Sequence, residues 1–137
     1  WQIIIEKFHS FFFKPTDDIY SKTKFITNHV NFNSYMVPED ELSKGAPRLL
    51  EVDNALYLPA KTHVDLLVTA NDVIHCWTVP SFGIKMDAVP GRINHASLFI
   101  ERTGTFYGQC SEICGVNHGF MPINIIAVDL TSFFVNN

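Results

Sequence analysis

Two thiols, an imidazole and a thioether lie within twelve residues near the C-terminus, and this cluster constrains the fold more than any other feature. The spacing is C-x3-C-x3-H-x2-M, with the side chains Cys110, Cys114, His118 and Met121. Soft thiolate and thioether ligands together with imidazole select copper, and Cys, His and Met on one loop are typical of single-copper electron-transfer sites. A second cysteine allows two bridging thiolates to hold two copper ions that share one electron's charge. The loop therefore predicts electron transfer.

Two other uses of these residues stay open. A Cys110–Cys114 disulfide is possible in an oxidising compartment, but it leaves the placement of His118 and Met121 to chance. Zinc could be bound by the two cysteines, His118 and a distant histidine, since zinc takes tetrahedral sulfur and nitrogen ligands. Structural zinc sites usually end in a histidine pair or a second cysteine pair and make no use of methionine, so copper is favoured.

Length and composition indicate one folded domain, because the chain has 137 residues, of which 47% are apolar and 18% charged. The net charge of −4 argues against nucleic acid and favours a cationic protein partner. Three cysteines give no disulfide framework, since Cys76 is left over. No run approaches the roughly 18 consecutive apolar residues of a membrane span. We expect a mature or trimmed soluble unit without a signal peptide or transmembrane segment.

Short β-favouring runs alternate with turn residues from residue 48 onward. Strands of about 5–8 residues with almost no helical periodicity indicate an all-β, antiparallel sandwich or barrel. The expected strands are 49–58, 62–69, 73–79, 96–101, 105–109 and 123–130, with a Pro/Gly loop over 80–91 and Pro122 blocking the start of the last strand. The first third is less regular, with possible helical turns at 14–18 and 37–42.

The ligand loop connects the expected strands 105–109 and 123–130, which can hold it rigidly. Two copper ions bridged by two sulfurs need two imidazoles, so a second histidine must come from elsewhere. The candidates are His9, His29, His63, His75 and His95. We favour His75 because it lies in the apolar strand 73–79, whereas His63 and His95 have polar neighbours typical of a surface. Side chains alternate along a strand, so Cys76 should point away from copper if His75 points toward it.

These segments resemble the copper-bearing domain of cytochrome c oxidase subunit II, in its mitochondrial version. The likeness covers roughly residues 32–130 and is carried by 71–92, by 107–121 and by the shorter segments 34–38 and 49–54. It implies a cupredoxin-like Greek-key β-barrel over 48–137, preceded by an extension of irregular and partner-contacting segments over 1–47. It also implies the dinuclear copper centre CuA. Its ligands would be the side chains of His75, Cys110, Cys114, His118 and Met121 and the backbone carbonyl of Glu112.

The family takes electrons from cytochrome c and passes them to haem a in the catalytic haem-copper subunit I, which reduces oxygen to water. This role implies a place in proton-pumping complex IV, on the intermembrane-space side of the mitochondrial inner membrane. The Glu112 carboxylate would reach a magnesium ion shared with subunit I. Asp53 and Asp72 match acids that dock cytochrome c, or are solvated surface charges. Asp87 and Arg92 match the contact with subunit I, or form a local turn salt bridge.

Three features depart from the family pattern. The two N-terminal membrane helices are missing, and Cys76 stands where the family usually has serine. The aromatic run before the domain is barely recognisable, although aligning Glu6 with its acid places Trp1 at the electron-entry tryptophan. We therefore expect half of a split subunit, with the helices on a separate chain, and a trimmed chain as the alternative. The N-terminal aromatics are expected to pack on a partner subunit, or else to be buried against the open end of the barrel itself: Phe8, Phe11, Phe12 and Phe13.

A free-standing electron carrier or copper chaperone of cupredoxin fold is the rival interpretation. Such a carrier would not need Glu112, Asp87 and Arg92 to face a partner. An enzyme acting without partners is disfavoured, because no labile coordination position or general acid/base pair is evident.

Overall fold

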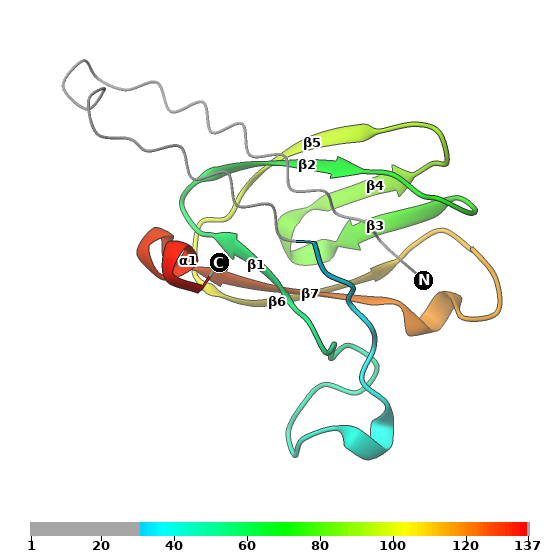
Figure 1. Ribbon diagram of the computed structural model, residues 1–137, viewed down its shortest axis with the longest axis horizontal. Coiled ribbons are helices and arrows are strands. Elements are labelled where there is room, and N and C mark those ends of the chain that lie inside the picture. Colours follow the sequence, from blue (N-terminus) through cyan, green and yellow to red (C-terminus); the bar gives the residue numbers. More distant parts are fainter. Residues whose placement is uncertain (1–30, 137) are drawn as a thin grey trace.

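A computed structural model describes residues 31–136, and in this part of the chain seven strands form two sheets (Figure 1). The larger sheet has the order β1-β7-β6-β3-β4, and the smaller one pairs β2 with β5. The strands are β1 Leu56–Pro59, β2 His63–Val68, β3 His75–Val79, β4 Ile84–Ala88, β5 Asn94–Phe99, β6 Gly104–Cys110 and β7 Pro122–Val128. Three 3₁₀ turns, η1 Glu39–Glu41, η2 Pro80–Phe82 and η3 His118–Phe120, and the helix α1 Leu130–Asn136 complete the fold.

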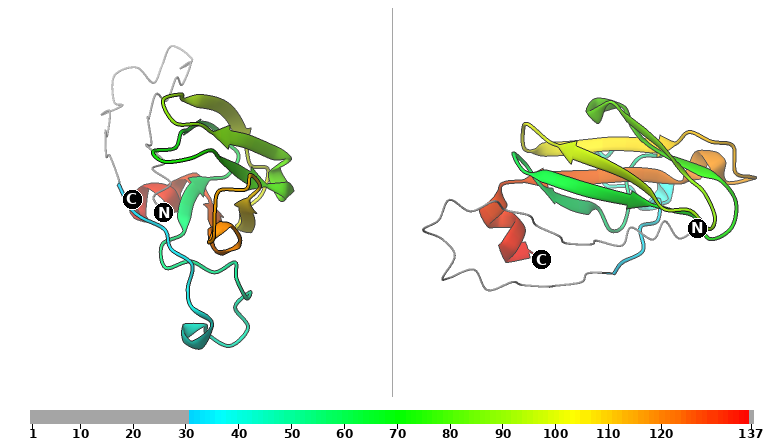
Figure 2. Two further views of the ribbon diagram at one scale, coloured as in Figure 1. Left: turned by 90° about the vertical axis from the view of Figure 1, so that its right-hand side faces the viewer. Right: turned by 90° about the horizontal axis from the view of Figure 1, so that it is seen from above.

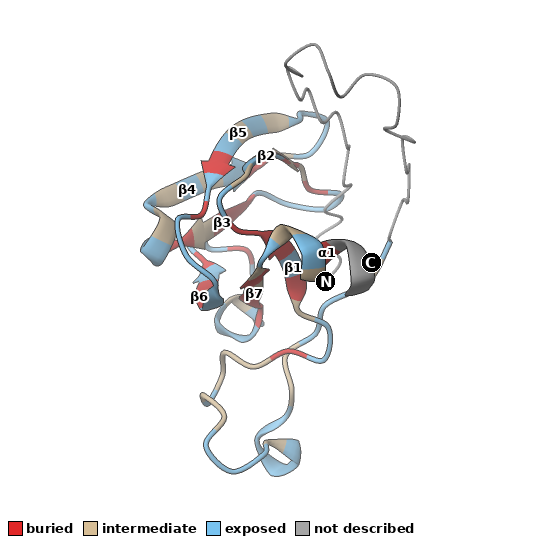
Figure 3. Ribbon diagram, turned by 90° about the vertical axis from the view of Figure 1, so that its left-hand side faces the viewer, coloured by how far each residue is buried: buried red, intermediate tan, exposed pale blue. Residues whose placement is uncertain are grey.

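One hydrophobic core joins the two sheets, because strands of both sheets contribute apolar side chains to a single buried cluster. The small sheet contributes Leu66, Val68 and Leu98, and the large sheet contributes residues such as Val79 and Ile125, both fully buried. Buried residues follow β1, β3 and β7 in Figure 3, whereas the excursion over 38–50 is largely exposed or half-buried. The prediction of an all-β fold is confirmed.

The expected exclusively antiparallel pairing was wrong at one edge of the large sheet. β1 runs parallel to β7, with Leu56 opposite Ile125 and Pro59 opposite Val128. The other pairs, β2–β5, β3–β4, β3–β6 and β6–β7, are antiparallel as expected. Strand direction follows from the path of the connecting segments, which a local sequence pattern does not contain.

The loop expected over 80–91 was also wrong, because it contains β4. Half-buried Ile84 and Met86 alternate there with exposed Lys85 and Asp87, which is the period of a strand. Turn residues on both sides masked this five-residue pattern. Similarly, the strand expected at 49–58 is reduced to β1, because the chain bends at 53–54. Pro122 begins β7 rather than blocking it, a position that proline tolerates.

The turn expected over 37–42 is the short η1, and the turn expected at 14–18 lies outside the described residues. The helix α1 was not predicted, although its cap is readable. The Asp129 carboxylate accepts hydrogen bonds from the Ser132 backbone N–H at 3.2 Å and from the hydroxyls of Thr131 and Ser132. These bonds lower the pKa of Asp129 to about 2. Figure 2 shows α1 at the opposite end of the domain from η3.

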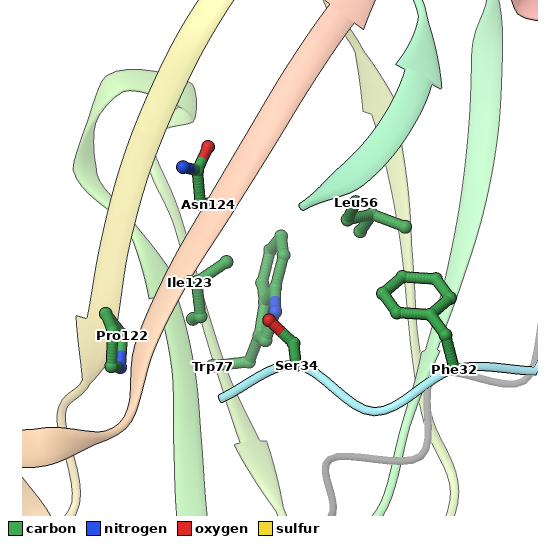
Figure 4. A pocket seen from close by; sticks show the side chains of 7 residues that line it. All are labelled: Phe32, Ser34, Leu56, Trp77, Pro122, Ile123 and Asn124. Atoms are coloured by element: carbon green, nitrogen blue, oxygen red, sulfur yellow. The ribbon is translucent and has the colours of Figure 1, made fainter. Parts of the chain in front are cut away.

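A segment before residue 38 packs on the β-domain. Met36 bridges to Val52, Val37 N–H donates to the Glu51 carbonyl at 2.9 Å, and Phe32 packs against the core. Phe32 and Ser34 line a cavity of about 40 Å³ together with Leu56, Trp77 and residues 122–124 (Figure 4). The boundary between an N-terminal extension over 1–47 and a cupredoxin-like domain over 48–137 remains a prediction.

The pairing of β3 with β6 depends on a close backbone approach at Gly108. In this register Trp77 lies opposite Cys110, and Thr78 opposite Gln109. A Cβ at position 108 would lie 2.1 Å from the Thr78 carbonyl oxygen and 2.9 Å from a Val79 methyl carbon. Glycine is therefore required at this contact, which brings the start of β3 next to the end of β6.

Gly108→Ala should separate β3 from β6 and destabilise the fold by roughly 1–3 kcal/mol, the usual cost of overpacking. Urea unfolding followed by tryptophan fluorescence would measure the change. Gly119→Ala is the matched control, because a Cβ there meets nothing within 4 Å. Equal unfolding midpoints for the two variants would contradict the close approach.

Candidate metal centre

The residues of the predicted copper loop converge at one end of the domain with the start of β3. His75 is the first residue of β3, and Cys110 is the last residue of β6. Cys114 lies in the following loop, His118 opens η3, and Met121 directly precedes β7. In Figure 1 this loop lies at the end opposite α1. Two strand termini and one short loop thus supply all the candidate side-chain ligands.

Each of the two cysteine sulfurs lies next to the Nδ1 atom of a different histidine. The Sγ atoms of Cys110 and Cys114 are 3.9 Å apart. His75 Nδ1 lies 4.0 Å from Cys110 Sγ, and His118 Nδ1 lies 3.5 Å from Cys114 Sγ. Each cysteine sulfur also has a second candidate metal ligand beside it. The Glu112 carbonyl oxygen lies 3.3 Å from Cys110 Sγ, and Met121 Sδ lies 3.4 Å from Cys114 Sγ. Among the described residues, His75, Cys110 and Cys114 have ligand atoms close enough together to hold a metal ion, and we call them the metal-binding group.

The centre is largely shielded from water. Cys110, Cys114 and Met121 are each 8% exposed, and together they form a small buried cluster. Burial, followed by the adjacent Cys110, raises the pKa of the Cys114 thiol to about 11. In the metal-free chain this thiol therefore holds its proton at neutral pH, and a bound metal must displace it. Two thiols, two imidazoles and a thioether suit copper, because methionine is a soft ligand.

The Asp72 carboxylate lies within hydrogen-bond distance of the His75 ring. His75 Nε2 lies 2.8 Å from Asp72 Oδ1. This hydrogen bond is the main reason why the pKa of Asp72 lies below its usual value. An ionised carboxylate only accepts hydrogen bonds, so the hydrogen of this bond is on Nε2, and Nδ1 is the nitrogen that faces Cys110 Sγ. Sequence reasoning treated Asp72 only as a docking acid, although the i,i+3 spacing was a possible signal.

The remaining predicted partner residues do not join the metal-binding group. Asp53 is exposed, and its carboxylate accepts the backbone N–H groups of Tyr35 and Asn54, each at 2.7 Å. Asp87 on β4 and Arg92 in the turn before β5 are exposed, and no ion pair joins these two described residues. Their docking roles remain predictions. Outside the described residues lie Trp1, His9, His29, Phe8, Phe11, Phe12 and Phe13.

The other described histidines and Cys76 lie apart from the cluster. His63 and His95 are exposed on β2 and β5, as expected of surface residues. Cys76 is 1% exposed, and its Sγ lies 3.4 Å from Thr78 Oγ1. Burial raises the pKa of this thiol. This geometry agrees with strand alternation, in which Cys76 and His75 point to opposite faces of β3.

Cys76→Ser should leave the copper content and the optical spectrum of the loaded chain unchanged, because this side chain faces away from the ligand donors. Cys110→Ser, by contrast, should change the thiolate-to-copper charge-transfer bands, because one of the two thiolate donors is lost. Copper analysis and absorption spectroscopy of both variants make the comparison. Loss of these bands in Cys76→Ser would show that the β3 geometry differs in the loaded protein.

Comparison with known proteins relates the chain to one family. The family model described as cytochrome c oxidase subunit II, periplasmic domain, matches residues 9–128. Cytochrome c oxidase subunit 2 of Branchiostoma floridae is 64% identical over 104 residues, which are 76% of this chain and 45% of that protein. The Vigna unguiculata protein, named as mitochondrial, is 61% identical over 74% of this chain and 27% of its own length.

Solved structures show the same fold. The periplasmic domain of cytochrome oxidase subunit II from Bradyrhizobium japonicum matches with a TM-score of 0.72 and 44% identity, over 78% of this chain and 74% of that chain. A subunit II domain in a mixed disulfide with a thioredoxin-like protein matches with a TM-score of 0.64 and 42% identity, over 78% and 72%.

The fold and the cluster of soft donors therefore define a cupredoxin-like domain, as the sequence predicted. The chain belongs to the cytochrome c oxidase subunit II family. It spans less than half the length of the curated relatives described above. Within residues 31–136, no helix combines the length and the apolar character that a bilayer crossing requires.

Proposed function

We propose that this chain binds two copper ions as a CuA centre and transfers electrons within cytochrome c oxidase. The observation that carries the proposal is the pair of sulfurs 3.9 Å apart, each beside its own imidazole Nδ1. Two copper ions held by these residues would supply a site that accepts and releases one electron. The ligands would be the side chains of His75, Cys110, Cys114, His118 and Met121 and the backbone carbonyl of Glu112.

The surroundings suit electron transfer better than substrate chemistry. His75 and Cys110 lie at strand ends and Met121 directly precedes β7, so these three side chains can stay nearly in place when the charge of the centre changes. Around the buried donors the loop exposes apolar side chains, with Ile113 81% and Val116 97% exposed, together with Phe120. Exposed apolar surface of this kind usually marks a protein contact. The centre would therefore be covered by a partner protein.

By family resemblance, the electrons would come from cytochrome c and pass to haem a in the catalytic subunit I. Asp53 and Asp72 would dock cytochrome c, consistent with the net charge of −4. Asp87 and Arg92 would contact subunit I, where the exposed Glu112 carboxylate would bind the shared magnesium ion. Trp1 would receive electrons, and a separate chain would carry the membrane helices. Relatives named as mitochondrial support a place on the intermembrane-space side of the inner membrane.

The copper-loaded chain should contain two copper ions and show one unpaired electron delocalised over both in its oxidised form. The physical reason is that two bridging thiolates couple the metals. Copper analysis with electron paramagnetic resonance would test this. One copper per chain with a single-nucleus hyperfine pattern would contradict the dinuclear centre, and bound zinc would favour the alternative metal.

Membership of the oxidase should appear as co-purification of the native chain with haem-containing membrane complexes. This outcome follows from the apolar rim of the ligand loop, which needs a covering partner. Haem spectra and mass spectrometry of the detergent-solubilised complex would identify the associated subunits. A native chain found only free of haem proteins would instead support a free-standing carrier or copper chaperone.

A further inference from the structure

We propose that Asp72 is a positioning residue for the copper centre, which holds the His75 ring with Nδ1 toward the metal and lowers the reduction potential. This inference rests on the proposed copper site. It assigns to Asp72 a role inside the domain, in addition to any role in docking a partner.

The positioning role follows from the contacts of the two ring nitrogens of His75. His75 Nε2 lies 2.8 Å from Asp72 Oδ1, while Nδ1 faces Cys110 Sγ at 4.0 Å. The His75 side chain is 9% exposed and the Asp72 side chain 46% exposed, so the carboxylate lies between the surface and the buried ring. Only the tautomer with hydrogen on Nε2 satisfies the carboxylate and leaves Nδ1 able to bind a metal. Carboxylates orient metal-binding histidines in this way in many proteins.

The tuning role follows from charge. The Asp72 carboxylate lies 2.8 Å from His75 Nε2, so its negative charge acts at short range on a candidate copper ligand. A negative charge near the copper pair favours its more positive, oxidised state. The hydrogen bond to Nε2 acts in the same direction, because it makes the imidazole a stronger donor. Removing the charge should therefore make the centre easier to reduce.

The chain contains a matched control for this interaction. Asp65 on β2 pairs with His95 on β5, with Oδ1 and Nε2 3.1 Å apart. Asp65 is 48% exposed, close to the exposure of Asp72, but His95 is not part of the metal-binding group. Asp65→Asn thus removes the same charge and a similar His–Asp pair without touching a candidate ligand.

The positioning role can be tested without copper. Nitrogen NMR of the metal-free, full-length chain should show His75 as the Nε2–H tautomer. Asp72→Ala should give a mixture of tautomers, whereas Asp65→Ala should leave His75 unchanged. A wild-type His75 protonated on Nδ1, or a tautomer that does not change in Asp72→Ala, would overturn the positioning role.

The tuning role is tested in the copper-loaded chain by spectroelectrochemical titration. Asp72→Asn keeps an acceptor oxygen but loses the charge. It should shift the one-electron exchange equilibrium with a reference couple about tenfold toward reduced copper, which corresponds to about 59 mV. Asp72→Glu should restore most of the wild-type potential, and Asp65→Asn should leave it nearly unchanged. A potential unaffected by Asp72→Asn, or shifted equally by Asp65→Asn, would overturn the tuning role.

The tautomer measurement and the redox titration together distinguish a failure of this inference from a failure of the proposed function. If the chain binds no copper, the proposed function fails, while the tautomer measurement still decides whether Asp72 orients His75. If copper binds as a dinuclear centre but the Asp72 variants behave like the wild type, the proposed function stands and this inference fails.

Discussion

The candidate metal centre depends on one backbone contact, the pairing of β3 with β6. These strands are distant in the sequence, yet their register places Trp77 opposite Cys110. His75, two residues before Trp77, is thereby brought beside the Cys110 thiol. The contact requires a residue without a side chain at Gly108, where β6 lies against the Thr78 carbonyl. A glycine outside the ligand loop thus determines whether the fifth side-chain donor reaches the other four.

The environment of the centre changes over a short distance from buried to exposed. The thiols and the thioether are buried, which would keep water from competing for a bound metal and limit reorganisation of the site. Outside them, Asp72 links the His75 ring to the surface, and the exposed apolar residues of the loop surround the centre. A single acid is therefore placed to affect both the inner ligand and an approaching cationic protein. These two effects would be coupled, since any cation near Asp72 reduces its action on His75.

Part of the fold could be predicted because its signals are local. Runs of β-favouring residues between turns indicated most of the strands, and alternation along β3 indicated that Cys76 and His75 face opposite sides. β4 was missed because glycine and proline on both sides hid a short alternating pattern. The parallel pairing of β1 with β7 has no local signal, because it depends on how distant segments come together. The helix α1 was overlooked although Asp129 is a typical cap.

The sequence by itself predicted the chemistry of the site, because Cys110, Cys114, His118 and Met121 share one short loop and offer the soft donors that favour copper. It also singled out His75 among six histidines, through the apolar character of its strand. The tertiary structure decided which nitrogen of His75 faces the sulfurs and which residue holds the ring there. That information depends on the distance between the Asp72 carboxylate and Nε2, and on a strand register formed by residues far apart in the chain. Such geometry arises only when the core between the two sheets has packed.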